Sequence, residues 1–155
     1  MKHIIILGKL ESKYSCPYFE DPEVEIWTMN KHWDMDMIPR IDKTFDLHEE
    51  PEIEADYTKN NFPFDQCHEL VKGRRFCTTM AYMLAFAVLQ NVKKISIYGC
   101  KYQSDGNPRR QRELHNVREM IFFCLGRNIE IEIGEDDVEY LFPEHINLEG
   151  QDFDQ

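Results

Sequence analysis

Several residues of this chain could hold a phosphate group through their side chains or backbone. Gly8 to Ser12 directly follows a branched apolar run; the glycine would let a ligand approach the backbone, and Lys9 and Ser12 could contact phosphate oxygens. Thr78 and Thr79 precede a long apolar block, and the free N–H groups at the start of a helix attract anions. An ordinary turn and an ordinary helix cap explain the same residues, so both interpretations stay open.

An amide side chain and a group of arginines extend this set. Asn30 follows a short alternating segment, and its amide can offer a donor and an acceptor to a base or sugar edge, although Asn is also a common turn residue. One side of an expected helix carries Arg109, Arg110, Arg112 and Arg118. We expect these arginines to be a solvated surface, with a phosphate clamp as the alternative.

The sequence gives weaker evidence for a metal site or a catalytic cysteine than for phosphate binding. His48, Cys67 and His68 lack the spacing of structural zinc sites, so we expect no metal ligands and no cofactor. Cys100 would need a neighbouring histidine to act as a nucleophile, and a free cysteine is more often an inert core residue. The five cysteines include no C-x-x-C pair, which favours reduced thiols and a cytoplasmic location.

The segment around residues 77–99 organises the predicted fold. Two threonines precede ten consecutive apolar residues, and a helix that is apolar on every side must be buried. A polar turn and the alternating residues 94–98 follow, which together predict the helix-to-strand half of a βαβ unit. Gly99 would then lie at the carboxyl end of a strand, where open α/β sheets bind ligands.

Further apolar segments complete an α/β pattern. Strands are predicted at residues 3–7, 24–28, 44–47 and 129–133, the last of them at a sheet edge with its glutamates facing water. A helix beginning at Pro108 would bury Leu114, Val117, Ile121 and either Leu125 or Cys124. We therefore predict an α/β three-layer Rossmann-like fold with a mostly parallel central sheet of about five to six strands.

Length and charge divide the chain into a body and a tail. Residues 1–134 form the expected domain, and 135–155 an acidic tail with one helical turn at 136–142.

Trp33 and the methionines of 31–42 suit core packing, with a flap over a pocket or a partner surface as alternatives.

The charge limits the classes of partner. The 155 residues have a net charge of −11, but residues 128–155 carry ten acids and no Lys or Arg, so the body is nearly neutral. This argues against bulk nucleic acid and anionic membranes, and residues 1–15 show no targeting segment. The net charge does not exclude a small phosphorylated ligand, because the electrostatic field at its binding site is set by the groups nearby.

Together these segments resemble a layout shared by bacterial sialyltransferases of glycosyltransferase family 42, archaeal hydroxymethylpterin pyrophosphokinases and small phage-encoded Rossmann-like proteins. In those families a Gly-x-Gly-x-Ser loop follows the first strand and an Asn ends the second, and Gly8 to Ser12 and Asn30 are similar. The closest likeness lies in residues 78–101, with YMLAFA followed by KISIYG. Leu10 replaces the second loop glycine, and Lys101 stands where those families have an Asp.

The resemblance implies a nucleotide pocket at the carboxyl edge of the sheet, which holds cytidine monophosphate in the sialyltransferases. The loop residues would approach the phosphate, Asn30 the sugar or base, and the two threonines the nucleotide. Tyr102 is similar to a phosphate-binding tyrosine, and His115 to a general base. The implied pocket residues are Gly8, Lys9, Ser12, Asn30, Thr78, Thr79, Gly99, Cys100 and Lys101, with Tyr102 and His115 as catalytic candidates.

Three functions follow as hypotheses. The first is a nucleotide-binding or nucleotide-sugar-binding protein that acts as a glycosyltransferase-like enzyme. The second is a non-catalytic sequestering or regulatory module, which Lys101 favours because a cation would strengthen the binding of an anion. The third is a protein-interaction module that kept the fold and lost the pocket. In the first two, the expected partner is a small phosphorylated ligand.

Overall fold

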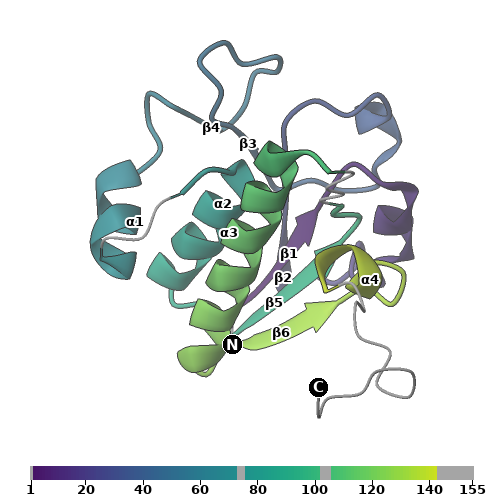
Figure 1. Cartoon of the computed structure of the whole chain (residues 1–155). Helices are drawn as coiled ribbons and strands as arrows, with labels where there is room; N and C mark the ends of the chain where they lie inside the picture. The colour runs from purple at the N-terminus through teal and green to yellow at the C-terminus, as the bar shows by residue number, and fades with distance from the viewer. Residues whose placement is uncertain (1, 73–75, 102–105, 143–155) are drawn as a thin grey trace.

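The structure is a computed structural model that describes residues 2–72, 76–101 and 106–142. Its centre is a six-stranded sheet in the order β4-β3-β2-β1-β5-β6, and every neighbouring pair is parallel. This confirms the predicted α/β, Rossmann-like fold (Figure 1). The strands are β1 (His3–Leu7), β2 (Val24–Met29), β3 (Lys43–Asp46), β4 (Tyr57–Thr58), β5 (Lys94–Tyr98) and β6 (Glu130–Ile133).

Helices cover one face of the sheet, and short 3-10 helices with their loops cover the other. Figure 1 shows α1 (Phe64–Val71), α2 (Thr79–Leu89) and α3 (Pro108–Gly126) on the same side. The opposite face packs against residues of η1 (Glu11–Ser15), η2 (Met35–Met37) and their flanking loops. The last described helix, α4 (Val138–Leu141), follows β6.

The alternation of β1 explains why both faces are apolar. Ile4 and Ile6 point into the larger core under the helices, whereas Ile5 and Leu7 point into the smaller core under the 3-10 layer. All four side chains are fully buried, as expected for a strand covered on both faces. Helix α2 is buried over most of its length, which confirms the prediction made from its ten apolar residues.

The structure decides one open alternative and corrects one predicted detail. Of the two alternatives for the fourth buried position of α3, Cys124 is the buried one and Leu125 is 47% exposed, because a step of three from Ile121 keeps closer to the buried stripe of the helix. Glu132 does not face water freely: one of its carboxylate oxygens accepts hydrogen bonds from Tyr18, Ser96 and Tyr98. Strand β6 is at the sheet edge as predicted.

Helix α1 and strand β4 were not predicted from the sequence. An acidic tail was predicted from residue 135 onwards; within it Asp137 and Leu141 are fully buried, so packing extends past residue 134. The expected helical turn in that segment is α4. Within the described ranges, no helix combines the length and the hydropathy that crossing a membrane requires.

Candidate functional site

The carboxyl ends of β1 and β5 meet at the point where the strand order reverses. From β1 the chain builds β2, β3 and β4 on one side and later adds β5 and β6 on the other. In open α/β sheets, ligands bind in the crevice at such a switch point. Gly8 follows β1 and Gly99 follows β5, so the sequence placed both glycines correctly at this edge.

The two glycines are in contact with each other and leave little room for a ligand between them. A Cβ atom at Gly8 would lie 2.3 Å from the carbonyl oxygen of Gly99. Gly8 N–H donates to the carbonyl of Tyr98, and Leu10 N–H donates to that of Gly99. Gly99 has a φ of +78°, which favours glycine. Close contact between the two strand ends therefore accounts for both glycines.

An internal carboxylate occupies the position predicted for a phosphate. The Ser12 hydroxyl donates to Asp137 Oδ1 at 2.6 Å, and Gly99 N–H donates to Asp137 Oδ2 at 2.9 Å. The Asp137 side chain is fully buried. Ser12 and Gly99 thus both donate to an anion, and this anion belongs to the chain itself.

A buried polar network lies beside this position, between the 3-10 layer and the strand ends. The Lys13 ammonium is fully buried and donates to Asp34 Oδ1 at 2.7 Å, to His32 Nδ1 at 3.1 Å and to the Lys9 carbonyl at 3.3 Å. The Tyr14 hydroxyl donates to the other oxygen of Asp34. Every proton of the ammonium therefore has an acceptor, which is the condition for keeping such a charge buried.

The tautomer of His32 follows from these contacts. An ammonium can only donate, so Nδ1 of His32 accepts from Lys13 and its proton is on Nε2. Nε2 lies 2.9 Å from the Thr28 hydroxyl oxygen and 3.1 Å from the Met29 carbonyl. The Thr28 hydroxyl in turn donates to the Leu7 carbonyl of the neighbouring strand. The network thus fixes the segment after β2 to the end of β1.

The network shifts the pKa values of its members in defined directions. Burial, followed by the nearby Lys13 charge, lowers the pKa of His32 below its ordinary value. Burial by itself would raise the pKa of Asp34, but hydrogen bonds from Lys13 and Tyr14 outweigh it and hold that pKa below the ordinary value. The network at neutral pH is therefore an ion pair with a neutral imidazole.

The lowered pKa of His32 predicts a loss of stability at mildly acidic pH. The unfolded chain takes up a proton near pH 6.5 and the folded chain only at lower pH, so the free energy of unfolding falls as pH drops below about 6.5. One histidine contributes up to about 1.4 kcal/mol per pH unit. His3, whose pKa is lowered by burial and then by Lys94, adds a second contribution.

Urea denaturation of the wild type and of His32→Asn between pH 5 and pH 7.5 measures this effect. In His32→Asn the free energy of unfolding is expected to depend less steeply on pH, because the contribution of His32 is lost. The contribution of His3 should remain. His115→Asn is the matched control, because that histidine is exposed in the folded chain as well. An unchanged slope in His32→Asn would contradict the assignment.

Asn30 ends β2 in an unusual conformation with an unpaired acceptor. Its φ is +59°, and its N–H donates to the Phe45 carbonyl at 2.8 Å. The side-chain Oδ1 is buried and has no hydrogen-bond partner within the described residues. Three residues later Trp33 is 79% exposed between buried His32 and Asp34, so the expectation that it packs in the core was wrong.

The remaining predicted pocket residues differ in how they are placed. Thr78 is at the N-cap position of α2, and α2 and α3 both begin at the carboxyl edge of the sheet (Figure 1). The Lys101 ammonium lies 4.8 Å from the centre of the Tyr140 ring. Cys100 is buried, and burial, with a smaller contribution from Asp137, raises the pKa of its thiol, which disfavours a nucleophilic thiolate. Lys9 is exposed and Thr79 is half-buried.

Only one of the two catalytic candidates lies in the described part of the chain. His115 is exposed on α3, and its side chain makes no hydrogen bond to another described residue; Tyr102 lies outside the described residues. The arginines do not form one clamp: Arg109 and Arg110 pair with Glu113, whereas Arg118 donates to the Leu141 carbonyl.

The residues considered as zinc ligands have different surroundings. His48 Nδ1 is 2.7 Å from Asp46 Oδ1, and Cys67, which belongs to α1, is fully buried in the main core. Among the described residues, no group of three or more His, Cys, Asp or Glu side chains is arranged to hold a metal ion.

The site residues predicted from the sequence did not include Lys13, His32, Asp34 or Asp137. Each lies in a segment that resembles an exposed loop or tail, and Ser12 and Asp137 are 125 residues apart in the chain. One signal was available: His32 and Asp34 flank Trp33 at a spacing of two, which puts them on one side of an extended segment.

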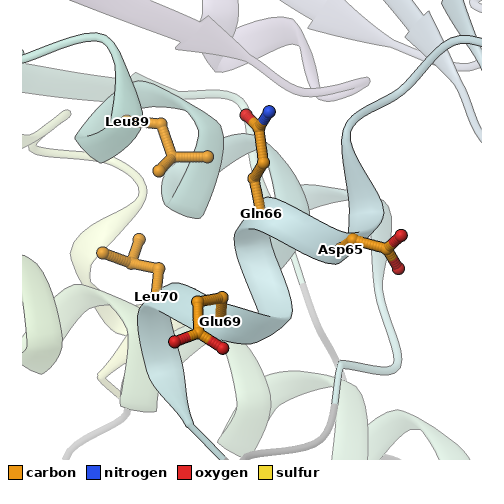
Figure 2. Close-up of a pocket in the computed structure, with 5 residues that line it drawn as sticks. All are labelled: Asp65, Gln66, Glu69, Leu70 and Leu89. Carbon is orange, nitrogen blue, oxygen red and sulfur yellow. The ribbon is translucent and has the colours of Figure 1, made fainter.

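A groove of about 550 Å³ lies elsewhere on the molecule, between α1 and α2. Figure 2 shows Leu70 and Leu89 across from each other, with Gln66, Asp65 and Glu69 around them. Leu89 ends α2 and precedes β5, so the groove is at the opposite end of the sheet from Gly8 and Gly99. Its two carboxylates also make it a poor place for a phosphate.

Comparison with known proteins supports the predicted likeness of fold. No protein family and no curated protein matches the sequence. Among solved structures, the sialyltransferase CST-II in complex with a trisaccharide acceptor and CMP is 12% identical, with a TM-score of 0.50 over 90% of this chain and 84% of that one. The sialyltransferase CstII from Campylobacter jejuni in complex with CMP-3FNeuAc is 13% identical, with a TM-score of 0.49 over 86% and 80% of the two chains.

An α-2,3-sialyltransferase from Campylobacter jejuni in its apo form is 14% identical, with a TM-score of 0.49 over 90% of this chain and 79% of that one. At these identities the comparison concerns the fold alone. This chain therefore has a fold similar to that of bacterial sialyltransferases, as its strand-end residues and its segment 78–101 predicted.

Proposed function

We propose that this chain binds a nucleotide or nucleotide sugar at the carboxyl edge of its sheet, with Asn30 holding the base or the sugar. The observation that carries the proposal is the buried Oδ1 of Asn30, which accepts no hydrogen bond within the described residues. A buried acceptor without a donor costs about 1–3 kcal/mol. An amino group of a base or a hydroxyl of a sugar would supply that donor.

The surroundings of Asn30 support this assignment. The backbone hydrogen bond to Phe45 fixes the residue in its left-handed conformation, so the amide is already oriented before a ligand arrives. The exposed indole of Trp33 is held between two buried neighbours and offers a rigid surface on which a base can stack. A protein of similar fold has been solved with CMP bound, which makes CMP the first ligand to test.

Binding without turnover is the better-supported form of this function. Glycosyl transfer needs a base near the reacting atoms and groups that stabilise the departing phosphate. Here Lys101 contacts Tyr140, and the anion position at Gly99 holds Asp137. A sequestering or regulatory module needs neither a base nor a leaving-group site.

Glycosyl transfer is the second candidate, and the exposed position of His115 on α3 is the observation in its favour. Single-turnover hydrolysis of CMP-sugars and UDP-sugars distinguishes the two. Sugar release by the wild type above the rate of His115→Ala would move the proposal from binding to transfer.

Removing the Asn30 amide is expected to weaken ligand binding about tenfold, the effect of one hydrogen bond. Glycine is the suitable replacement because it tolerates the positive φ. The measurement is calorimetric or thermal-shift titration with CMP, UMP, AMP and GMP.

Asn91→Gly is the matched control for this variant. Asn91 also has a positive φ, of +60°, but it is exposed in the turn between α2 and β5, at the other edge of the sheet. It is expected to bind as the wild type does. If no nucleotide moves the melting curve, or if both variants bind equally well, the proposal is wrong.

A further inference from the structure

The segment from Gly134 to Phe142 lies over the end of β5 and makes several specific contacts there. Asp137 receives hydrogen bonds from Ser12 and from the backbone of Gly99. Leu141 is fully buried in the main core, so the segment is anchored as well as hydrogen-bonded. Figure 1 shows α4 beside the carboxyl ends of β5 and β6.

The same segment also engages cations that an anionic ligand would otherwise meet. The ring of Tyr140 lies against the Lys101 ammonium, with 4.8 Å between the nitrogen and the ring centre. The Leu141 carbonyl accepts from Arg118 Nε at 2.6 Å, and the Arg118 guanidinium lies over the Phe142 ring. The segment therefore covers Lys101 together with both donors at the switch point.

The geometry at Asp137 is that of a bound carboxylate ligand. Two donors from distant parts of the chain each contact a different oxygen, and one of them is a backbone N–H that cannot turn away. The site is also closely fitted: a Cβ atom on Gly134 would lie 2.6 Å from Asp137 Oδ2. Fixed donors that surround a fully buried anion form a built anion site.

We propose that the Ser12 hydroxyl and the Gly99 N–H form a site for a small oxyanion at the switch point, and that the Asp137 carboxylate is its resident ligand. The segment from Gly134 to Phe142 then acts as an internal plug. The inference stands on these contacts, and it extends the proposed function. A nucleotide held by Asn30 would place its phosphate elsewhere while the plug is closed.

Removing the Asp137 carboxylate is expected to open this site to a free anion. In Asp137→Ala, sodium formate should raise the midpoint of thermal unfolding on the order of 5 °C above the value in sodium chloride of equal ionic strength. In the wild type and in Asp136→Ala the two salts should act alike. Asp136 is the matched control because it is the exposed neighbour of Asp137.

Asp137→Ala could be unfolded in sodium chloride, and a second measurement tests the proposal in that case. In that case formate should restore its circular dichroism spectrum, and failure to do so overturns the proposal. Asp137→Asn keeps the shape of the side chain and should fold without responding to formate. Adding Ser12→Ala to Asp137→Ala should abolish the formate response. An undiminished response in the double variant, or an equal response in the wild type, would show that the anion binds elsewhere.

Titration with cytidine and with CMP separates this inference from the proposed function. The wild type should bind the two with similar affinity, whereas Asp137→Ala should bind CMP at least tenfold more tightly than cytidine. A formate response without any nucleotide binding would keep the anion site and remove the proposed function. A wild type that strongly prefers CMP, with no formate response in Asp137→Ala, would overturn the plug and keep the nucleotide site.

Discussion

Replacing Lys13 with methionine is expected to lower the free energy of unfolding by about 3–5 kcal/mol, because it leaves the Asp34 carboxylate buried without its counter-ion. Methionine keeps most of the apolar stem, so the loss reports the ammonium and not a cavity. His32 loses a donor in the same substitution. Urea denaturation at pH 7 measures the loss.

Two comparisons make this expectation specific. Lys9→Met removes an exposed lysine four residues away and is expected to change stability by less than about 0.5 kcal/mol. The double variant Lys13→Met/Asp34→Asn should cost at least about 1 kcal/mol less than the sum of its two single variants, because the residues share one interaction. Additive costs would mean that Lys13 stabilises the fold through packing alone.

Replacing Gly8 with alanine is the second large effect, a loss of at least about 3 kcal/mol. The new Cβ would lie 2.3 Å from the Gly99 carbonyl oxygen, 2.7 Å from its carbonyl carbon and 2.8 Å from the Cα of Cys100. All three are backbone atoms and cannot change rotamer. The ends of β1 and β5 would have to separate, which would weaken the bond from Gly8 N–H to Tyr98.

Gly126→Ala is the matched control for this substitution. Gly126 is the last residue of α3, and a Cβ there would have no atom within 4 Å. Alanine is the better helix former, so the control should be neutral or more stable by up to about 1 kcal/mol. Thermal or urea unfolding compares the two variants directly. Equal stability of the two would contradict the contact between Gly8 and Gly99.

Periodicity and turn residues were sufficient to predict the framework of this fold. The alternating runs at β1 and β5 end at Gly8 and Gly99, and their predicted bounds agree with the structure. The uninterrupted apolar run of α2 predicted its burial, and Pro108 predicted the start of α3. Such signals are local, because one element by itself must bury its apolar face. The resemblance in segment 78–101 led to the same fold.

Local signals could not predict the elements or contacts that depend on distant partners. Helix α1 buries only Cys67 and Val71 among its eight residues, so its apolar stripe is too narrow to read from the sequence. Lys13 and Asp34 look like ordinary loop charges until the fold brings them together. Asp137 lies within a run of acids, and nothing local distinguishes it from exposed Asp136.

The candidate site illustrates the same division. The predicted strand ends placed Gly8, Ser12 and Gly99 at one edge of the sheet, where the structure also has them. It could not show that close backbone contact uses the space between the two glycines, or that Asp137 supplies the anion. Both outcomes depend on exact distances between segments far apart in the chain, and composition carries no information on those distances.

The separation of 125 residues between Ser12 and Asp137 has a consequence for the newly made chain. Translation at roughly 5–20 residues per second leaves about 6–25 s between the emergence of the two residues from the ribosome. The contact between them therefore cannot contribute to the earliest folding of the chain, and the end of β5 acquires its carboxylate partner only after nearly all of the described residues have been made.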